Sequence, residues 1–503
     1  MARSKLTSLL CTVSSGALLM MTNSPAHCAS ATPEKPNILF IMTDQQSAEM
    51  MSCAGNTYLK TPAMDSIAAN GMRFEGAYSP NPVCMPARTA MVTGHFPSAF
   101  GFFSNEDTDR AVIPRQVMDN TMAKVMQRAG YRTVFGGKTH WVGELENPET
   151  SGFEFITKDY RDQLAAKCAE FLRGKHDEPF FLVASFMNPH DICFVGLDAT
   201  SRHYGLPLLL AKEAKADRAN VQAAIRLAEQ AKKDGVYDSL CPPVKKNAGP
   251  TRNQSDYTWP YIAPPPADAA RHPRDVYKYQ NPYLQTQWKD EDWRLHSWIY
   301  HRLTEDVDRQ IWIVLEALRE TGLDKNTIVV FTSDHGEMDG AHGLVQKPFL
   351  YDEAARVPFL VSGPSIPRGV DTKNMVSLVD LLPTFCDFGG GKVPEGLPGR
   401  SIKALAQGSA TSDDNHFVVA ETQGGNRRGW MLRTTRYKYC FYNEGKNREV
   451  LFDMQTDPGE MNNIAAEPDA KQILHDHRAL LQGWMKKTGG PEASEYMRQF
   501  LAN

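Results

Sequence analysis

The chain contains 503 residues, of which 42% are apolar and 23% are charged. This composition is ordinary for a globular protein, and it excludes a disordered tail protein, a collagen and a disulfide-dense miniprotein. The formal net charge of −4 disfavours a nucleic-acid binder, because proteins that track phosphates are normally basic. The length predicts two to three domains, or one large α/β core with additions.

The N-terminus has the order of features of a secretory signal peptide. Arg3 and Lys5 precede an uncharged, mostly apolar run over residues 6–21, and residues 29–31 match an A-x-A cleavage site. The alternative is an N-terminal membrane anchor, but the apolar run is shorter than the roughly 20 residues that span a bilayer. We therefore expect residues 1–31 to be a signal peptide cleaved near Ala31, and the mature protein to be secreted or periplasmic without stable membrane insertion.

Three short apolar runs, each followed by polar residues, predict the centre of a sheet. The runs cover residues 37–42, 180–186 and 327–332. The segments that follow them are Thr43-Asp44-Gln45-Gln46, Asn188-Pro189-His190-Asp191 and Ser333-Asp334-His335-Gly336. Uninterrupted apolar strands are typical of a sheet covered on both faces, and sites in open α/β sheets form at the carboxyl ends of strands. We expect a functional site where these strands end.

The patterns between and after these strands predict two structural regions. Helical periodicity at residues 63–70, 120–129, 161–173 and 303–321 alternates with the strands, which favours an α/β fold. From about residue 400, short strands at 417–420, 429–434, 437–442 and 449–453 precede a helix at 469–487. We expect an α/β domain over residues 32–390 and a C-terminal α+β subdomain over residues 391–503, with a small antiparallel sheet and a packed helix.

Residues 195–300 fit neither pattern and are interpreted as an insert in the α/β domain. Within it, residues 212–233 predict a charged, alanine-rich helix with little apolar face, and residues 241–300 are rich in proline and aromatic residues. The aromatic candidates for stacking on sugar rings are Trp259, Tyr261, Tyr279, Trp288 and Trp293. The same side chains can instead pack the insert onto the core, and the sequence leaves both interpretations open.

The segment Cys84-Met85-Pro86-Ala87-Arg88, followed by Thr93-Gly94, is the most informative motif. Taken alone, the cysteine is more simply a buried structural thiol. The C-x-P-x-R pattern with T-G at this spacing, however, resembles the formylglycine signature of the type I sulfatase family, which belongs to the alkaline phosphatase superfamily. In that family the cysteine is oxidised to an aldehyde after synthesis.

Five further segments resemble motifs of that family in the same order along the chain. They are Gly136-Gly137-Lys138-Thr139-His140, Asn188-Pro189-His190, Ser333-Asp334-His335-Gly336-Glu337, Gly340-Ala341-His342-Gly343-Leu344 with Lys347, and the C-terminal pattern over residues 449–463. The resemblance implies a large mixed sheet flanked by helices, like that of alkaline phosphatase, and a sulfuric ester hydrolase activity. It also implies a maturation partner, either a formylglycine-generating enzyme or an anaerobic sulfatase-maturating enzyme.

The chemistry of a sulfate ester gives a physical reason for such a modification. A hydrated aldehyde at position 84 carries two hydroxyls, and one of them can attack sulfur. The other can then collapse back to the aldehyde and expel sulfate. A thiol or a serine lacks that second hydroxyl and would need water to break its own sulfate ester.

The residues at the predicted strand ends have the composition of a divalent-cation site. Carboxylate and amide oxygens are the ligands of hard cations. The resemblance implies that one such cation, usually Ca²⁺, is bound by Asp44, Gln45, Asp334, His335 and the modified Cys84. Many members carry Asp and Asn where this sequence has Gln45 and His335. The combination of Asp-Gln with Asp-His resembles choline-sulfatase and some glycan-sulfatase branches. For each residue alone, a helix cap or turn is the alternative.

The resemblance also implies roles for the charged residues around position 84. Arg88 would hold the modified residue, and Lys138 and Lys347 would contact sulfate oxygens. His140 would assist collapse of the gem-diol, and His190 would protonate the leaving oxygen. Imidazole suits both tasks because its unperturbed pKa is roughly 6.5. The weaker candidates, expected to be structural, are His95, Asp191 and His342.

We predict a secreted sulfatase that acts on a sulfated carbohydrate. The alternatives are a phosphonate monoester or phosphodiester hydrolase of the same superfamily, a choline-sulfatase-like enzyme, and a binding protein that lost turnover. Retention of all motif positions argues against the last. Six cysteines outside position 84 and the signal peptide could form up to three disulfides, and the sequence does not decide whether they do. They are Cys53, Cys168, Cys193, Cys241, Cys386 and Cys440.

Overall fold

The computed structural model describes residues 35–105, 111–195, 214–247, 288–410, 416–424, 427–443, 448–488 and 490–502. The expected signal peptide and three of the aromatic candidates, Trp259, Tyr261 and Tyr279, lie outside the described residues. Within the described part of the chain, no helix is long and apolar enough to cross a membrane.

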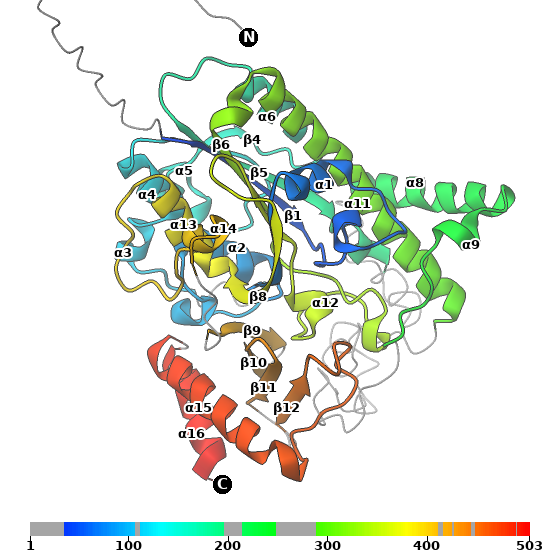
Figure 1. Cartoon of the computed structure of the whole chain (residues 1–503), viewed down its shortest axis with the longest axis vertical. Helices are drawn as coiled ribbons and strands as arrows, with labels where there is room; N and C mark the ends of the chain where they lie inside the picture. Colours follow the sequence, from blue (N-terminus) through cyan, green and yellow to red (C-terminus); the bar gives the residue numbers. More distant parts are fainter. Residues whose placement is uncertain are drawn as a thin grey trace, which may run out of the picture. The chain divides into compact units, whose positions relative to one another are not determined.

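A mixed sheet of eight strands organises the larger part of the fold (Figure 1). Its order is β4-β3-β5-β1-β6-β7-β2-β8. The strands are β1 (Asn37–Asp44), β2 (Gly71–Tyr78), β3 (Arg132–Gly137), β4 (Glu154–Thr157), β5 (Phe180–Pro189), β6 (Thr327–Ser333), β7 (Phe359–Ser362) and β8 (Gly369–Ser377). β7 runs antiparallel to both of its neighbours, and the other pairings are parallel. The three predicted apolar runs are β5, β1 and β6, which lie side by side, so this prediction is confirmed.

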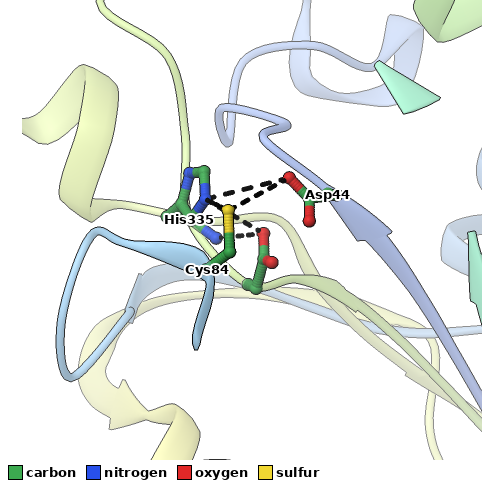
Figure 2. Close-up of side chains that lie close together, drawn as sticks. Asp44, Cys84 and His335 are labelled. Carbon is green, nitrogen blue, oxygen red and sulfur yellow. Dashed lines mark hydrogen bonds and ion pairs between the residues drawn. The ribbon is translucent and has the colours of Figure 1, made fainter. Parts of the chain in front are cut away.

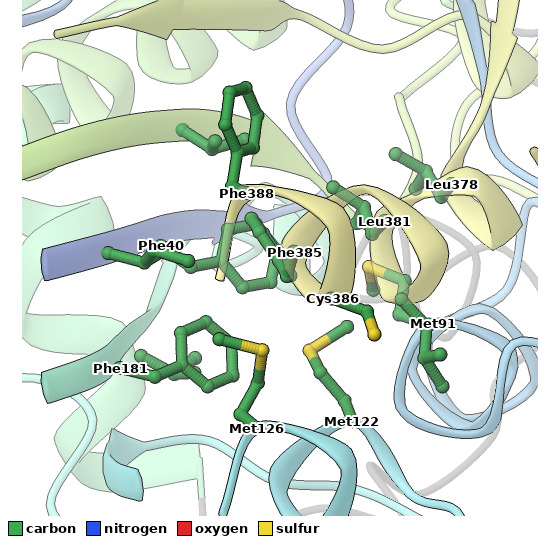
Figure 3. Packing of buried hydrophobic residues seen from close by; sticks show 14 of the residues in the cluster. Phe40, Met91, Met122, Met126, Phe181, Leu378, Leu381, Phe385, Cys386 and Phe388 are labelled. Atoms are coloured by element: carbon green, nitrogen blue, oxygen red, sulfur yellow. The ribbon is translucent and has the colours of Figure 1, made fainter. Parts of the chain in front are cut away.

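Helices cover both faces of this sheet, which explains why the central strands are apolar throughout. Side chains alternate between the faces of a strand. In β1, Phe40 packs with one set of helices, which contribute side chains such as Met122 and Phe385 (Figure 3). Its neighbour Leu39 packs on the opposite face with side chains such as Val307. The predicted α/β fold with a large mixed sheet is therefore confirmed.

The longer helices of this region are α1 (Pro62–Ala69), α2 (Cys84–Thr93), α4 (Met122–Arg128), α6 (Leu164–Leu172), α8 (Ala214–Lys233), α11 (Asp290–Glu320) and α13 (Leu381–Phe388). Single-turn helices are α3 (Arg115–Met118), α5 (Pro148–Ser151), α9 (Tyr237–Leu240), α12 (Asp352–Ala355) and α14 (Lys403–Ala406). The helices expected at 63–70, 120–129 and 161–173 correspond to α1, α4 and α6, with ends shifted by one to three residues.

Two predictions about the insert were wrong. The helix expected at 303–321 begins at Asp290, so the last eleven residues of the expected insert belong to a core helix, α11. Its aromatic residue Trp293 is buried, and Trp288 packs on it with ring centroids 4.6 Å apart. The helix expected to lack an apolar face, α8, buries Val221, Ala224 and Ala228 in a cluster shared with α11. Small alanines at this spacing hide an apolar stripe among charges.

The C-terminal part contains a second, antiparallel sheet of four strands in the order β12-β11-β10-β9. Its strands are β9 (Val418–Gly424), β10 (Arg427–Arg433), β11 (Tyr437–Tyr442) and β12 (Glu449–Asp453), followed by α15 (Lys471–Lys487) and α16 (Gly490–Ala502). All four strands and α15 are close to the predicted positions, whereas α16 was not predicted. Trp430 on β10 and Leu481 on α15 share a core with Ala90 of α2.

Charged groups also join this sheet to the rest of the fold. Lys438 on β11 is fully buried, and its Nζ lies 2.6 Å from Asp352 Oδ1 and 2.7 Å from Glu460 Oε1. Asp352 begins α12, and the Ala354 carbonyl of this helix accepts the Gly336 N–H at 2.7 Å. The seven cysteines within the described residues are all free thiols, so they form no disulfide with one another.

Candidate active site

The ends of β1 and β6 and the beginning of α2 bring three distant sequence motifs together. Asp44 ends β1, Cys84 is the first residue of α2, and Asp334 and His335 follow β6. Figure 2 shows Asp44, Cys84 and His335 facing one another. Cys84 Sγ lies 3.7 Å from Asp44 Oδ1 and 3.1 Å from His335 Nε2. Ligand atoms of all four residues lie within 4.8 Å of one another, and all four residues are buried.

Local sequence explains how Cys84 reaches this position. Tyr78 ends β2, and a short loop turns the chain into the ten-residue helix α2. Asn81 fixes the loop by donating from Nδ2 to the Phe103 carbonyl at 2.9 Å. Gly94 ends the helix in the left-handed region, with φ of 71°, which glycine adopts without steric cost. The side chain at position 84 therefore lies at a helix N-terminus, where the helix dipole favours negative charge.

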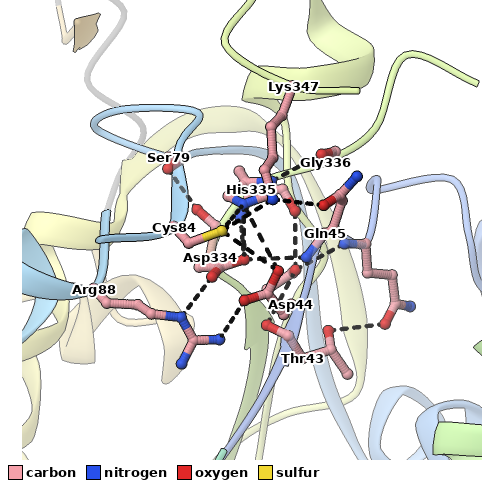
Figure 4. Close-up of polar contacts among 12 residues, drawn as sticks. Thr43, Asp44, Gln45, Ser79, Cys84, Arg88, Asp334, His335, Gly336 and Lys347 are labelled. Carbon is pink, nitrogen blue, oxygen red and sulfur yellow. Dashed lines mark hydrogen bonds and ion pairs between the residues drawn. The ribbon is translucent and has the colours of Figure 1, made fainter. Parts of the chain in front are cut away.

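Arg88, one turn further along α2, binds both carboxylates of the cluster (Figure 4). Its Nε donates to Asp334 Oδ2 at 2.6 Å, and a terminal nitrogen donates to Asp44 Oδ2 at 3.1 Å. The other terminal nitrogen donates to the Lys138 carbonyl and to Ser185 Oγ, both at 2.8 Å. In the structure Arg88 thus contacts Asp334 and Asp44, and its expected role of holding the modified residue stays a prediction.

Two lysines supply further positive charge. Lys138, directly after β3, places Nζ 2.6 Å from Asp44 Oδ2. Lys347 places Nζ 3.0 Å from Cys84 Sγ and 2.6 Å from Gln45 Oε1. Burial opposes ionisation of Asp44, but Lys138 and other nearby cations hold its pKa well below the usual range. Burial and Asp44 oppose ionisation of Cys84 too, yet Lys347 and Lys138 lower the pKa of this thiol well below its usual value.

The orientation of His335 is fixed by its own segment. Its Nδ1 lies 2.9 Å from the Gly336 carbonyl, so this nitrogen carries the proton that makes the hydrogen bond. Nε2 is thereby directed toward Asp44 and Cys84. Burial lowers the pKa of His335, but the neighbouring Asp334 and Cys84 raise it overall. A metal ion at this position would take the place of the proton, because metal and proton compete for the same lone pair.

The donor set fits a divalent cation. Ligand atoms of Asp44, Cys84, Asp334 and His335 converge, and the Gln45 amide oxygen contacts the same ammonium, Lys347 Nζ, as Cys84 does. Lys138 and Arg88 pair with the two carboxylates. Oxygen-rich sites of this kind suit hard cations such as Ca²⁺ or Mg²⁺, and one imidazole does not exclude them.

The two histidines predicted as proton carriers lie at the ends of neighbouring strands. His190 directly follows β5, and burial together with Lys347 lowers its pKa to about 3. His140 lies three residues after β3, with φ of 51°. Among the described residues, no polar group contacts His140 Nδ1, although that atom is buried. Both are partly exposed at the carboxyl edge of the sheet.

The three weaker candidates make structural contacts. Asp191 Oδ1 pairs with Arg161 at 2.6 Å. His95 Nδ1 lies 2.8 Å from the Thr93 carbonyl. The His342 ring stacks on Tyr351 with centroids 3.8 Å apart.

Sequence reasoning missed two residues that hold the cluster in place. Glu337 accepts a hydrogen bond from Gln45 Nε2, and the Tyr300 hydroxyl donates to the Gln45 carbonyl. Glu337 is part of the Ser333–Glu337 motif, so the sequence singled out its position but indicated no role for it. Tyr300 fell in the expected insert, and no local pattern linked it to the site.

Comparison with known proteins agrees with this geometry. Residues 36–391 match the family model described as Sulfatase, and residues 340–487 match the model described as N-sulphoglucosamine sulphohydrolase, C-terminal. The first match covers most of the chain, so the chain belongs to the sulfatase family and is a sulfuric ester hydrolase.

Several relatives and solved structures resemble the chain over nearly its whole length. A Delta 4,5-hexuronate-2-O-sulfatase of Bacteroides thetaiotaomicron is 30% identical over 481 residues, covering 92% of this chain and 91% of the relative. An N-acetylglucosamine-6-O-sulfatase of the same organism is 27% identical, covering 94% and 91%. The structure of a 2-O GAG sulfatase matches with 27% identity and a TM-score of 0.71, covering 90% and 93%. A phosphonate monoester hydrolase of Agrobacterium radiobacter, at 19% identity and a TM-score of 0.66, shares the fold, covering 90% of this chain and 96% of that one.

Proposed function

We propose that this chain is a secreted sulfatase that removes sulfate from a carbohydrate, with formylglycine at position 84 and one divalent cation, Ca²⁺, beside it. The observation that supports this most is the position of Cys84. Its Sγ lies at a helix N-terminus, 3.0 Å from Lys347 Nζ and 3.1 Å from His335 Nε2, among buried carboxylates. A structural thiol would instead pack among apolar groups, as Cys168 does.

The modified residue and the cation supply two chemical functions. A formylglycine hydrate at position 84 provides one hydroxyl to attack sulfur and a second whose deprotonation returns the aldehyde and releases sulfate. Asp44, Gln45, Asp334 and His335 would hold the cation, which adds positive charge next to the sulfate oxygens.

The surrounding side chains have separate tasks in this proposal. Lys347 and Lys138 stabilise the negative charge that develops on the transferring sulfate. His190 delivers a proton to the sugar oxygen that leaves, and His140 accepts a proton when the aldehyde is restored. Burial and Lys347 lower the pKa of His190 to about 3, and a sulfate anion between the two lysines would raise it again.

The relatives support a sulfated carbohydrate as the substrate class. The hexuronate-2-O-sulfatase and the N-acetylglucosamine-6-O-sulfatase both carry a sulfated sugar in their names. The pattern at residues 1–31 supports export to where sulfated glycans occur, and a formylglycine-generating or anaerobic maturating enzyme would modify Cys84 in the cell that makes the protein.

Two measurements test the proposal. Mass spectrometry of the peptide that contains residue 84, from protein made in a host with a maturating enzyme, should show loss of sulfur and gain of the aldehyde. An unmodified thiol in active protein would contradict the formylglycine mechanism.

The second measurement is release of inorganic sulfate from sulfated mono- and disaccharides and from choline sulfate. Phosphonate monoesters and phosphodiesters with matching alcohol groups are assayed beside them by release of the alcohol. We expect the highest kcat/KM on one sulfated sugar, and no turnover by Cys84→Ala. The phosphonate monoester hydrolase that shares the fold makes the paired esters a real alternative, and a preference for them would overturn the assignment.

A further inference from the structure

Gln45 can serve the proposed cation only if its amide is turned the right way. The oxygen and nitrogen ends of an amide have nearly the same shape, but only the oxygen can bind a cation. In the structure, Gln45 Oε1 accepts a hydrogen bond from Lys347 Nζ at 2.6 Å, and that ammonium also contacts Cys84 Sγ. The oxygen therefore faces the reacting residue.

Glu337 fixes the nitrogen end of this amide. Gln45 Nε2 donates to Glu337 Oε2 at 2.6 Å, and an ionised carboxylate can only accept hydrogen bonds. The Gln45 nitrogen must therefore face Glu337, which leaves the oxygen on the other side. Both side chains are fully buried, so water does not offer the amide another partner.

Glu337 is itself held by the backbone that leads to Lys347. Its Oε1 accepts the Gln346 N–H at 2.5 Å and the Asp339 N–H at 3.3 Å. The carboxylate therefore connects two parts of the site, because one oxygen orients Gln45 and the other fixes the segment that carries Lys347.

The backbone of Gln45 is fixed as well. Its φ of 67° lies in the left-handed region, which costs a non-glycine residue free energy. Asp334 Oδ1 accepts the Gln45 N–H at 3.1 Å, and the Tyr300 hydroxyl donates to the Gln45 carbonyl at 2.7 Å. With the backbone held on both sides, rotation of the amide is the freedom that remains, and Glu337 restricts it at the nitrogen end while Lys347 does so at the oxygen end.

We propose that Glu337 is a positioning residue that selects the oxygen of the Gln45 amide as a ligand of the cation. The inference rests on the proposed cation site. The proposal also specifies the charge of the ligand. The cation would be bound by the neutral Gln45 amide, and the Glu337 carboxylate would contact that amide and not the cation.

Substitutions that exchange the hydrogen-bond donor and acceptor between residues 45 and 337 test this proposal. In Glu337→Gln, the new Oε1 keeps the backbone N–H groups, so its NH₂ faces Gln45 and turns the Gln45 oxygen away from the cation. We expect Ca²⁺ affinity to fall about 10- to 100-fold, as for other residues that orient metal ligands. The double variant Gln45→Glu with Glu337→Gln restores one donor facing one acceptor, with the same total charge, and should bind Ca²⁺ at least as tightly as the wild type.

Calorimetric titration of CaCl₂ into EGTA-treated protein measures affinity without any turnover, and all proteins come from one host so that residue 84 is in the same state. Glu353→Gln is the matched control, because its carboxylate accepts from Asn247 Nδ2 at 2.7 Å and does not hold Gln45. We expect this control to bind Ca²⁺ with wild-type affinity.

Glu337→Gln with wild-type affinity would overturn the inference, and so would a double variant that binds no tighter than Glu337→Gln. If Glu337→Gln does not fold, the double variant decides, since a folded protein with wild-type affinity supports the inference. A double variant that is unfolded or binds tenfold more weakly than the wild type refutes it. Wild-type protein that binds none of Ca²⁺, Mg²⁺ and Mn²⁺ would refute the proposed cation site itself, which is a different result.

Discussion

Replacement of Arg88 by Met should destabilise the protein strongly, because it removes the cation shared by two buried carboxylates. The Arg88 side chain is 1% exposed, and Asp44 and Asp334 are both fully buried. Each of its two hydrogen bonds to a carboxylate, at 2.6 and 3.1 Å, is worth about 1.5–3 kcal/mol. Together they predict that the free energy of unfolding falls by about 3–5 kcal/mol, the usual cost of removing one partner from a buried ion pair. Lys138 still pairs with Asp44 in the variant, so Asp334 carries most of the loss.

The assay is urea unfolding followed by tryptophan fluorescence, in EGTA so that no divalent cation compensates the carboxylates. Arg88→Lys keeps the charge but lacks the planar fork of donors that serves both carboxylates and the Lys138 carbonyl, and it should recover less than half of the loss. Arg115→Met is the control, because its ion pair with Asp119 is exposed and should be worth less than about 1 kcal/mol. Equal losses for Arg88→Met and Arg115→Met would show that the two carboxylates do not depend on Arg88.

Three further predictions concern other titratable side chains. Lys438→Met leaves Asp352 and Glu460 without their shared ammonium and should cost about 3–5 kcal/mol in thermal unfolding, whereas an unchanged melting temperature would show that the pair contributes nothing net. Burial raises the pKa of Asp308 to about 6, so the folded state holds its proton more tightly than the unfolded state and the wild type loses stability as pH rises from about 4 to about 6. Asp308→Asn should therefore gain about 3 kcal/mol relative to the wild type over that range, and a pH-independent difference would contradict this. His190→Ala should lower kcat by about 10²–10⁴-fold on a sugar sulfate but much less on 4-nitrophenyl sulfate, whose leaving group needs no proton. Equal losses on both substrates would exclude His190 as the acid.

Local sequence was sufficient for the parts of the fold whose signal is continuous along the chain. The apolar run at residues 37–42 predicted β1, and the same reasoning found β5 and β6, because a strand buried on both faces must be apolar at every position. The residues directly after these strands were expected to lie close together, since parallel strands end at one edge of a sheet, and Asp44, Asp334 and His335 do so. The motif around Cys84 then indicated the chemistry.

Only the tertiary structure decided how these residues contact one another. Gln45 and Glu337 are 292 positions apart, and Gln45 and Tyr300 are 255 apart, so no local pattern could show that these residues contact one another. The start of α11 at Asp290 was hidden for a related reason, because its aromatic residues look like an exposed insert until the core they pack against is known. Sequence periodicity reports which side of an element is apolar, whereas hydrogen bonds across the fold depend on where the chain returns. The sequence therefore singled out the residues that meet at this edge of the sheet, whereas the contacts of Arg88, Glu337 and Gln45 with one another's neighbours came from the tertiary structure alone.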